Sequence, residues 1–442
     1  MKVARTSRRK ALGVWMNGLR VGEWAVAPGG EDEFRYAESW LEHPDSRPIS
    51  LSLPFAGAGY AYRGSLVSAY FENLLPDSSE IRRRIRVRYG AASSSTFDLL
   101  SEIGRDCVGA VQLLGADEEP AGLRRIEGRP IGESEIASVL NGLTAVGAGS
   151  ELSSDEFRIS LAGAQEKTAL LYRDGRWMVP HGSTPTTHIV KLPLGRIGGL
   201  SLDMSRSVEN EWFCLKIAAA MGFKTANCEI VRFEDVEALV VERFDRRFSS
   251  DGSWIMRLPQ EDFCQATGTH PDRKYESDGG PGIETIMRIL LGSQAAQEDR
   301  EGFFATQILF WLLAAPDGHA KNFSIFIERE GRFRLAPLYD IISVYPALGH
   351  GEGRMPQEKL KLAMAFSGKN RHYKWSEIGA RHIRETARRN GLEASIDGIL
   401  ERIASAAPRA VEEVLGRLPR GFPEEIAHSI ATGVVKRAEK LV

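Results

Sequence analysis

The hexapeptide Asp317-Gly-His-Ala-Lys-Asn322 places an acid and an amide five positions apart, with a lysine between them. This is the spacing of the protein-kinase catalytic loop, in which the aspartate accepts a hydroxyl proton and the asparagine binds Mg²⁺. An apolar run, 310–316, precedes it. A predicted hairpin at 323–335 separates it from Tyr339-Asp340, the position of a second metal ligand in kinases. The spacing predicts phosphoryl transfer, with Asp317 as base and Asn322 and Asp340 as magnesium ligands.

A lysine to neutralise the phosphates is also needed, and Lys191 is the candidate. It ends a strand-like run, Thr187–Lys191, and precedes a helical pattern at Glu209–Gly222. Strand lysine, helix with an acid, hinge strand, catalytic loop and metal aspartate follow one another in that order in kinases. Either Glu209 or Glu211 could pair with Lys191, and the backbone of 242–244 could bind adenine.

The segment Ser160–Thr168 lies where a kinase carries its phosphate-covering loop. It has one glycine and matches neither the G-x-x-x-x-G-K-[ST] nor the G-x-G-x-x-G pattern. Small residues with free backbone amides, together with Lys167, nevertheless suit a phosphate cradle. An ordinary β-turn is an equally good interpretation of this segment taken alone.

Each of these residues could instead be an ordinary turn or surface residue, because aspartate, asparagine and lysine are common in turns and on surfaces. Their joint order favours the kinase interpretation. A second alternative treats His188, His319, Asp317 and Asp340 as the metal ligands of a hydrolase. No two histidines have a ligand spacing, so this interpretation ranks lower.

The flanking sequence indicates an α+β protein. A hairpin signal at Asn17-Gly18 opens a β-rich unit, and strands then alternate with helices from Ser160. From about Ile283 the chain looks mostly helical apart from the hairpin at 323–335. An arginine cluster, Arg82, Arg83, Arg84, Arg86 and Arg88, is expected to form a solvated helix face. The expected units are an N-terminal domain (1–115), a connecting segment (116–155), an ATP-binding lobe (156–250) and the catalytic loop with a helical lobe (251–442).

The composition of the chain argues against several classes of partner and location. The 442 residues contain 57 Lys+Arg and 59 Asp+Glu, a net charge of -2, so the whole molecule creates no strong field for nucleic acid or an anionic membrane. Four scattered cysteines fit neither a zinc site nor a disulfide framework and are expected to be buried thiols. No apolar run is long enough to span a bilayer, and the basic start lacks the apolar core of a signal peptide. A cytoplasmic location without membrane contact is expected.

The whole pattern resembles the HipA family of bacterial type II toxin kinases. Seven segments distributed over the chain carry the resemblance: Ile159–Lys167, Thr187–Lys191, Val241–Arg247, Leu258–Asp262, Lys274–Gly282, Asp317–Asn322 and Tyr339–Ser343. The resemblance implies a bilobal protein-kinase-like core, distantly related to the phosphatidylinositol 3/4-kinases, with an N-terminal β-rich domain and a helical C-terminal lobe.

The resemblance also assigns roles by position. It implies a serine/threonine kinase that uses ATP and Mg²⁺, with Asp317 as base and Ser160 as an autophosphorylation site that silences the enzyme. The residues that it implies for ATP or Mg²⁺ contact are Lys191, Glu242, Arg243, Phe244, His319, Ala320, Lys321, Asn322, Tyr339 and Asp340. Those that it implies for the phosphate loop are Leu161, Ala162, Gly163, Ala164, Gln165, Glu166 and Lys167.

Partners are likewise implied by the family. They are a HipB-like helix-turn-helix antitoxin that represses the shared operon, and an aminoacyl-tRNA synthetase substrate, with glutamate-tRNA ligase as the first candidate, whose modification arrests growth and gives drug tolerance. Residues 366–442 carry 14 Lys+Arg against 10 Asp+Glu, a net of +4. Within them Lys369, Arg371, His372 and Lys374 are candidates for contact with operator DNA, although a solvated loop would look the same.

Two other functions remain open. A small-molecule phosphotransferase of the aminoglycoside or choline type shares the Asp, Asn, Asp arrangement. A non-catalytic, ATP-binding corepressor would use the same pocket without transferring phosphate. Phosphate incorporation into Ser160, and the effect of replacing Asp317, separate these possibilities from a protein kinase.

Overall fold

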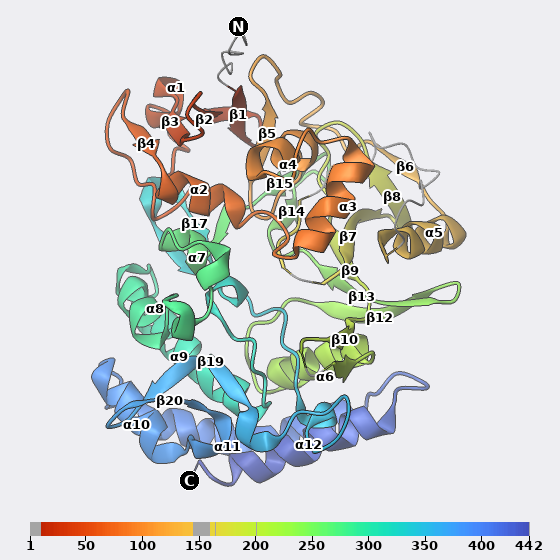
Figure 1. Cartoon of the computed structure of the whole chain (residues 1–442), viewed down its shortest axis with the longest axis vertical. Helices are drawn as coiled ribbons and strands as arrows, with labels where there is room; N and C mark the ends of the chain where they lie inside the picture. Colours follow the sequence, from red (N-terminus) through yellow and green to blue (C-terminus); the bar gives the residue numbers. More distant parts are fainter. Residues whose placement is uncertain (1–9, 145–159, 164, 200, 442) are drawn as a thin grey trace, which may run out of the picture.

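The computed structural model describes residues 10–144, 160–163, 165–199 and 201–441 (Figure 1). Its N-terminal part contains a five-stranded antiparallel sheet. Asn17 and Gly18 both have left-handed backbone angles (φ 46° and 86°), as a type I′ turn requires, and the predicted hairpin is confirmed. In spatial order the strands are β4 (Ala61–Arg63), β3 (Asp32–Tyr36), β2 (Leu19–Val26), β1 (Lys10–Met16) and β5 (Val111–Gly115).

Four helices accompany this sheet, and their apolar residues share one core with it. Trp24 of β2 stacks on Phe71 with ring centroids 3.9 Å apart, in the middle of that core. Such a ring pair contributes about 0.5–1.5 kcal/mol beyond the burial of its area. The helices are α1 (Glu38–Leu41), α2 (Ser65–Glu72), α3 (Ser79–Tyr89) and α4 (Thr96–Ile103).

The arginine cluster lies on α3, which begins at the capping side chain of Ser78 and ends at left-handed Gly90. The expected solvated face is wrong for two of its members. Arg82 pairs with Glu72, and Arg84 pairs with Glu166 of the candidate phosphate loop. These side chains are only 14% and 20% exposed, because α3 packs against another part of the chain.

A second, six-stranded antiparallel sheet follows. It confirms the predicted β7–β8 hairpin and the strands at Lys191 and Val241. Alternate residues of β13 face opposite sides, so Ala238 and Val240 share a core with α5, while Leu239 and Val241 share one with α6. In spatial order the strands are β12 (Cys228–Phe233), β13 (Val236–Glu242), β9 (His188–Lys191), β7 (Lys167–Arg173), β8 (Arg176–Pro180) and β6 (Gly128–Pro130); the helices are α5 (Glu133–Thr144) and α6 (Ser207–Ala220).

The expected connecting segment, 116–155, lies partly outside the described residues. Its described part contributes β6 to the six-stranded sheet, and α5, which shares a core with that sheet. A third sheet holds the predicted hairpin at 323–335 and consists of β16 (Gln260–Asp262), β17 (Ser324–Ile327) and β18 (Phe333–Leu335). Two small ribbons pair β10 (Gly195–Ile197) with β11 (Leu202–Met204), and β14 (Arg246–Phe248) with β15 (Ile255–Arg257).

Helices dominate the C-terminal region, as expected, and form the end of the molecule opposite the N-terminal sheet (Figure 1). One ribbon there was not foreseen: β19 (Lys361–Ser367) pairs with β20 (Arg371–Lys374). The helices are α7 (Phe263–Ala266), α8 (Ile283–Ile289), α9 (Ala296–Leu312), α10 (Ala380–Arg389), α11 (Ile396–Leu415) and α12 (Glu424–Ala438).

A buried ionic cluster joins the N-terminal part to the rest. Asp106 contacts Arg243, Arg246 and Arg257, and Asp245 accepts from two of these arginines, at distances of 2.8–3.3 Å. Burial alone would raise the pKa of Asp106, but the three guanidinium groups lower it. Because every side chain in the cluster is buried, neither part of the chain can expose its charges without losing these partners.

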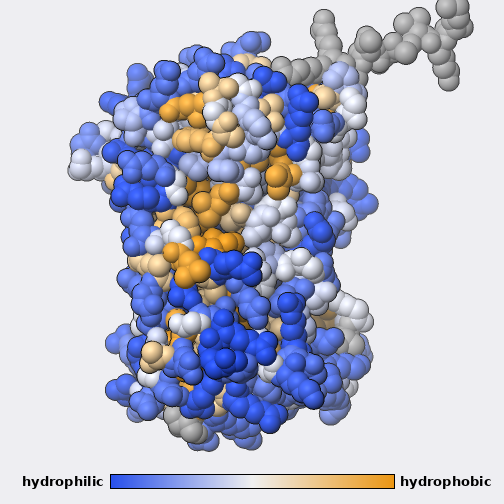
Figure 2. Space-filling model, turned by 90° about the vertical axis from the view of Figure 1, so that its left-hand side faces the viewer, coloured by the Kyte–Doolittle hydropathy of each residue, from blue (hydrophilic) through white to orange (hydrophobic). Residues whose placement is uncertain are grey.

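Apolar side chains gather on the face that carries α2 and α7, whereas the part of that face toward the C-terminal helices is mostly hydrophilic (Figure 2). All four cysteines are free and buried, as predicted. Among the described helices, none combines the length and apolar character that a membrane crossing needs.

Candidate active site

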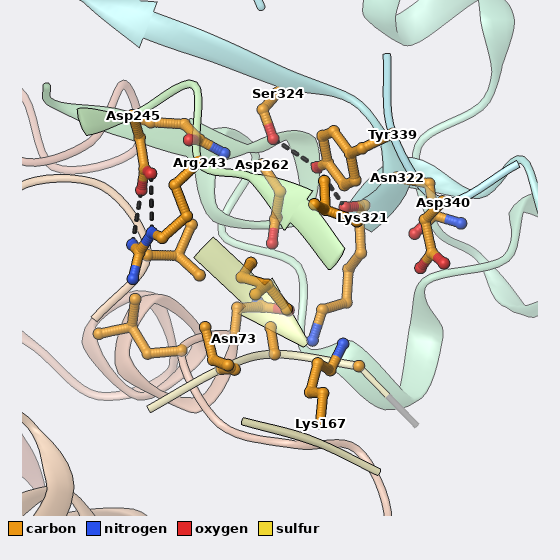
Figure 3. Close-up of a pocket in the computed structure, with 18 of the residues that line it drawn as sticks. Asn73, Lys167, Arg243, Asp245, Asp262, Lys321, Asn322, Ser324, Tyr339 and Asp340 are labelled. Carbon is orange, nitrogen blue, oxygen red and sulfur yellow. Dashed lines mark hydrogen bonds and ion pairs between the residues drawn. The ribbon is translucent and has the colours of Figure 1, made fainter. Parts of the chain in front are cut away.

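One pocket brings the candidate residues together between the six-stranded sheet, the three-stranded sheet and the N-terminal part (Figure 3). It is lined by most of the predicted site residues, including Leu161, Ala162, Gly163, Lys167, Lys191, Glu242, Arg243, Phe244, Asp317, His319, Lys321, Asn322, Tyr339 and Asp340. Ala320, Gln165 and Glu166 do not line it, and Ala164 lies outside the described residues. Residues that are far apart in the sequence therefore meet in a single cavity.

Asp317 begins the loop that follows α9, and its side chain is 54% exposed. Asn322 closes the loop: its Nδ2 donates to the Asp317 carbonyl at 2.6 Å. His319 Nε2 lies 3.6 Å from the Asp317 carboxylate, and the Tyr275 hydroxyl donates to the same Oδ1 atom. The Asp317 carboxylate is thus accessible from solvent while its backbone is fixed, which suits a group that must accept a proton from an incoming molecule.

Lys191 lies at the centre of the charged network. Its Nζ donates to Glu211 Oε1 at 2.7 Å and to Asp340 Oδ1 at 2.9 Å. Burial opposes the charge, but Asp340 and Glu211 outweigh it and raise the pKa of Lys191. Of the two glutamates left open by the sequence, Glu211 makes the contact, whereas Glu209 pairs with Arg206 at 3.0 Å.

Asp340 has a left-handed backbone (φ 58°), an uncommon conformation for a residue other than glycine. Its conformation directs the carboxylate toward Lys191. Burial raises its pKa, but Lys191 and Lys167 lower it to about 2, so the group is a carboxylate at neutral pH. Tyr339 supports the turn: its hydroxyl lies 2.5 Å from Ser324 Oγ and donates to the Lys321 carbonyl at 2.9 Å (Figure 3).

Asn322 and Asp340 offer oxygen atoms of the kind that Mg²⁺ binds. The Asn322 amide donates through Nδ2, which leaves Oδ1 for a cation, and Asp340 supplies a carboxylate in the same pocket. Within the described residues, no group of three or more His, Cys, Asp or Glu side chains could hold a metal. A cation here would take its other ligands from phosphate and water, as Mg²⁺ commonly does.

The candidate phosphate loop leads into β7, where Lys167 is paired with Lys191 of β9. Gly163 has φ 108°, a backbone conformation that favours glycine, and a Cβ at this position would lie 2.6 Å from Lys167 Nζ and would displace the end of the lysine. Burial and the nearby Lys191 lower the pKa of Lys167 to about 8. Gln165 and Glu166 have other partners, because Gln165 Nε2 donates to the Leu192 carbonyl at 2.5 Å and Glu166 pairs with Arg84.

Ser160 lies beside this loop but does not line the pocket. Its side chain is fully buried, and its Oγ donates to the Leu74 carbonyl at 2.7 Å. Its backbone N–H donates to the Asp106 carbonyl at 3.1 Å. In this conformation the hydroxyl cannot reach a nucleotide.

The predicted hinge divides into two parts. The N–H groups of Glu242 and Arg243 already donate to Asn227 and Thr187, and the Arg243 guanidinium belongs to the buried ionic cluster. Phe244 follows them, and its ring packs near Tyr339 with centroids 5.7 Å apart. Of the three backbone N–H groups in the predicted hinge, those of Glu242 and Arg243 are thus already used within the protein, which leaves that of Phe244 as the candidate donor.

Two other predicted groups lie elsewhere. His188, in β9, contacts Tyr172 and Trp177 and is not part of the pocket, so the four ligands of the hydrolase interpretation do not come together. The candidate DNA contacts lie on β20 and the turn before it. There Arg371 pairs with Glu276 at 3.1 Å, Lys374 pairs with Glu377 at 3.0 Å, and His372 stacks on His382.

Several pocket residues were missed from the sequence. Asp77 comes from the N-terminal part, Asp262 ends β16, and Lys274 precedes Tyr275. Burial raises the pKa of Asp262 to about 7, and its carboxylate caps α7 by accepting from the Gln265 N–H. Lys274 and Tyr275 belong to a segment that carried the family resemblance, which was their only signal; Asp77 had none.

Comparison with known proteins agrees with the class that the fold and the pocket define, that of the kinases. The HipA N-terminal domain model matches residues 12–114 and the HipA-like C-terminal domain model matches residues 159–411. A putative kinase of Sinorhizobium fredii, Y4mE, is 34% identical over 91% of this chain and 92% of its own. The chain belongs to the HipA family.

Two further relatives support this assignment. The serine/threonine-protein kinase toxin HipA of Shewanella oneidensis is 28% identical over 98% of this chain and 96% of its own length. In the solved complex of Shewanella oneidensis HipA, HipB and operator DNA, the matching chain has a TM-score of 0.78 at 24% identity and covers 97% of this chain, with 96% of its own length matched. The structural match confirms the mixed fold, with its N-terminal sheet and helical C-terminal region, and the homology supports a kinase.

Proposed function

We propose that this protein is a serine/threonine kinase that uses ATP and Mg²⁺, with Asp317 as catalytic base. The observation that carries the proposal is Lys191, held between Glu211 and Asp340 in a pocket that Asp317 and Asn322 also line. A lysine paired with a helix glutamate, next to a metal-binding aspartate, is the arrangement that kinases require for transfer. Lys167 and Lys191 would face the phosphates, and adenine would bind at Phe244.

The transfer follows from these positions. The hydroxyl oxygen of the acceptor attacks the γ-phosphorus, the bond from that phosphorus to the bridging oxygen breaks, and ADP leaves. The hydroxyl proton passes to the exposed carboxylate of Asp317. Magnesium, when bound, would neutralise phosphate charge, and Asn322 and Asp340 are the residues that would hold it.

The protein substrate is proposed to be an aminoacyl-tRNA synthetase, with glutamate-tRNA ligase as the first candidate. The test is transfer of labelled γ-phosphate to a panel of purified synthetases by the wild-type chain, by Asp317→Asn and by the control Asp272→Asn. Asp272 is an exposed aspartate whose side chain is 87% accessible. We expect one labelled synthetase with the wild type and the control, and at least about a 100-fold loss with Asp317→Asn.

Other outcomes identify the alternatives. Label on an aminoglycoside or choline but on no protein indicates a small-molecule phosphotransferase. Label on nothing, with ATP still bound, indicates a corepressor whose nucleotide site is not catalytic. Activity retained in Asp317→Asn contradicts the role of the base.

Autophosphorylation of Ser160 is part of the proposal. Since its hydroxyl is buried against Leu74, the loop must leave this position before transfer can occur. A phosphate, with a charge of about -1.5 to -2, would not return to that site, so the modified loop would stay out and the kinase would be inactive. Mass spectrometry of the chain incubated with ATP is expected to show phosphate on Ser160 in the wild type and none in Asp317→Asn.

We also propose that the protein joins a HipB-like antitoxin on operator DNA, because the HipA chain of similar fold was solved in such a complex. Lys369, Arg371, His372 and Lys374 are the proposed phosphate contacts. Replacing Lys369 and Lys374 by alanine should weaken operator binding of the complex and reduce the slope of log K against log salt by up to about 2. An unchanged slope would place the DNA contact elsewhere.

A further inference from the structure

A carboxylate from the N-terminal part of the chain enters the candidate active site. Asp77, in the turn between α2 and α3, lines the pocket together with Lys274 and Lys321. Its Oδ2 accepts from Lys274 Nζ at 2.7 Å, and its Oδ1 accepts from Lys321 Nζ at 2.6 Å. The Asp77 side chain is 16% exposed, so both ion pairs lie largely away from water.

Asp77 joins three separate segments of the site. Lys321 belongs to the loop of Asp317, and Lys274 precedes Tyr275, whose hydroxyl donates to Asp317. The Asp77 N–H donates to the Gly163 carbonyl at 3.1 Å, and Pro76 forms a parallel bridge with the same glycine. One residue of the N-terminal part therefore contacts the candidate catalytic loop, the segment before Tyr275 and the phosphate loop.

The charges explain why a carboxylate is needed there. Two ammonium groups that share one acceptor would repel each other without it, and the Lys321 side chain is only 4% exposed, so water cannot replace the lost partner. Burial raises the pKa of Asp77, but Lys321 and Lys274 lower it well below its usual range, so Asp77 is ionised at neutral pH.

We infer that Asp77 is a positioning residue for phosphoryl transfer: it holds Lys274 and Lys321 in place beside the phosphate loop and makes the N-terminal part a necessary component of the active site. This inference rests on the proposed kinase function. Loss of the carboxylate frees two lysines and removes one negative charge from the pocket, so that the net charge there rises by one. ATP binding should then be maintained or improved, while transfer becomes slower.

The experiment compares the full-length wild type with Asp77→Asn, Asp77→Glu and Asp45→Asn. Asp45 is a matched control because it also pairs across to the C-terminal part, with Arg329, but outside the pocket. The readouts are kcat and KM for transfer, the Kd of a non-hydrolysable ATP analogue with Mg²⁺, and the urea midpoint of each variant.

For Asp77→Asn we expect kcat to fall about 10- to 100-fold, with the analogue Kd unchanged or lower. Asp77→Glu should recover part of kcat, and Asp45→Asn should match the wild type. The inference is wrong if kcat of Asp77→Asn stays within about twofold of wild type, or falls only in proportion to its unfolded fraction. If the wild type transfers phosphate to no acceptor, both the proposed function and this inference are wrong. The wild-type reaction alone is enough to show this, so the two kinds of failure can be told apart.

Discussion

The hydroxyl of Tyr275 donates a hydrogen bond to the carboxylate of Asp317, the residue proposed to accept the proton of the substrate. The ring of Tyr275 also packs against His319, with centroids 5.0 Å apart and nearly perpendicular planes. Burial and the charge of Asp317 raise the pKa of Tyr275, so the phenol keeps its proton and remains the donor. The tyrosine therefore occupies one of the two carboxylate oxygens at which the acceptor hydroxyl of a substrate would bind.

The first prediction is that Tyr275→Phe increases kcat/KM for the protein substrate about three- to tenfold. A hydrogen bond to a charged group contributes about 1.5–3 kcal/mol, and an acceptor hydroxyl that binds at the same oxygen must displace this one. In the variant, water would hydrogen-bond to Asp317 instead, so only part of this free energy would appear as a faster reaction. Initial rates over a range of substrate concentrations would measure the change. A decrease would instead mean that Tyr275 holds Asp317 in its active orientation.

The second prediction concerns the two glutamates of α6. Glu211→Gln should lower phosphate transfer about 10- to 100-fold, because Lys191 loses the charged partner that orients it. Glu209→Gln, two residues earlier on the same helix, should stay within about threefold of wild type, since Glu209 pairs with the exposed Arg206 while Lys191 donates to Glu211. Equal losses in both variants would show that α6 responds to any change of charge and that the Lys191 pair has no special role.

The third prediction is a pH dependence of nucleotide binding. In the free protein the pKa of Lys167 is about 8, and anionic phosphates bind best to its charged form. ATP affinity should therefore fall as pH rises above about 8. Lys167→Arg, which stays charged, should flatten the curve between about pH 8 and 10. Titration of a fluorescent ATP analogue at each pH would measure the affinity. The same dependence of affinity on pH in both proteins would assign the change to a group other than Lys167.

The same lysine has an opposite effect on stability. Its pKa is lower in the folded chain than the ordinary value of 10.5, so between about pH 8 and 10.5 the unfolded state binds more protons. The contribution of Lys167 to the free energy of unfolding thus rises with pH in this window, while ATP binding weakens.

The fourth prediction is that Asp106→Asn destabilises the whole protein by about 3–5 kcal/mol. The change leaves three buried arginines with Asp245 as their only remaining carboxylate in the cluster. Asp45→Asn, at an exposed ion pair, should cost less than about 1 kcal/mol. Urea unfolding would compare the two. A loss below about 1 kcal/mol for Asp106→Asn would show that solvent enters the cluster.

Local spacing was enough to identify much of the candidate site. Asp317 and Asn322 are on one short loop, Asp340 follows a hairpin, and Lys191 ends a strand, so their roles could be predicted from order alone. The choice between Glu209 and Glu211 could not, because both residues are buried on α6 and only the direction of each side chain separates them.

Contacts between segments far apart in the sequence could not be predicted from it. Asp77 reaches Lys321 across 244 positions, and Arg84 reaches Glu166 from a helix whose sequence looks fully solvated. The ribbon β19–β20 was also missed. Its β19 strand is buried over nearly its whole length, so it lacks the alternation of polar and apolar residues that would mark a half-buried strand.

The cluster around Asp106 bears on how the chain is made. Its arginine partners follow 137, 140 and 151 positions later, so a ribosome synthesising about 5–20 residues per second delivers them roughly 7–30 s after the aspartate. Until then the nascent N-terminal part contains Asp106 without its three arginine partners. A chain released before residue 257 would lack the Arg257 contact of this cluster, and also the part of the pocket that residues 260–340 supply.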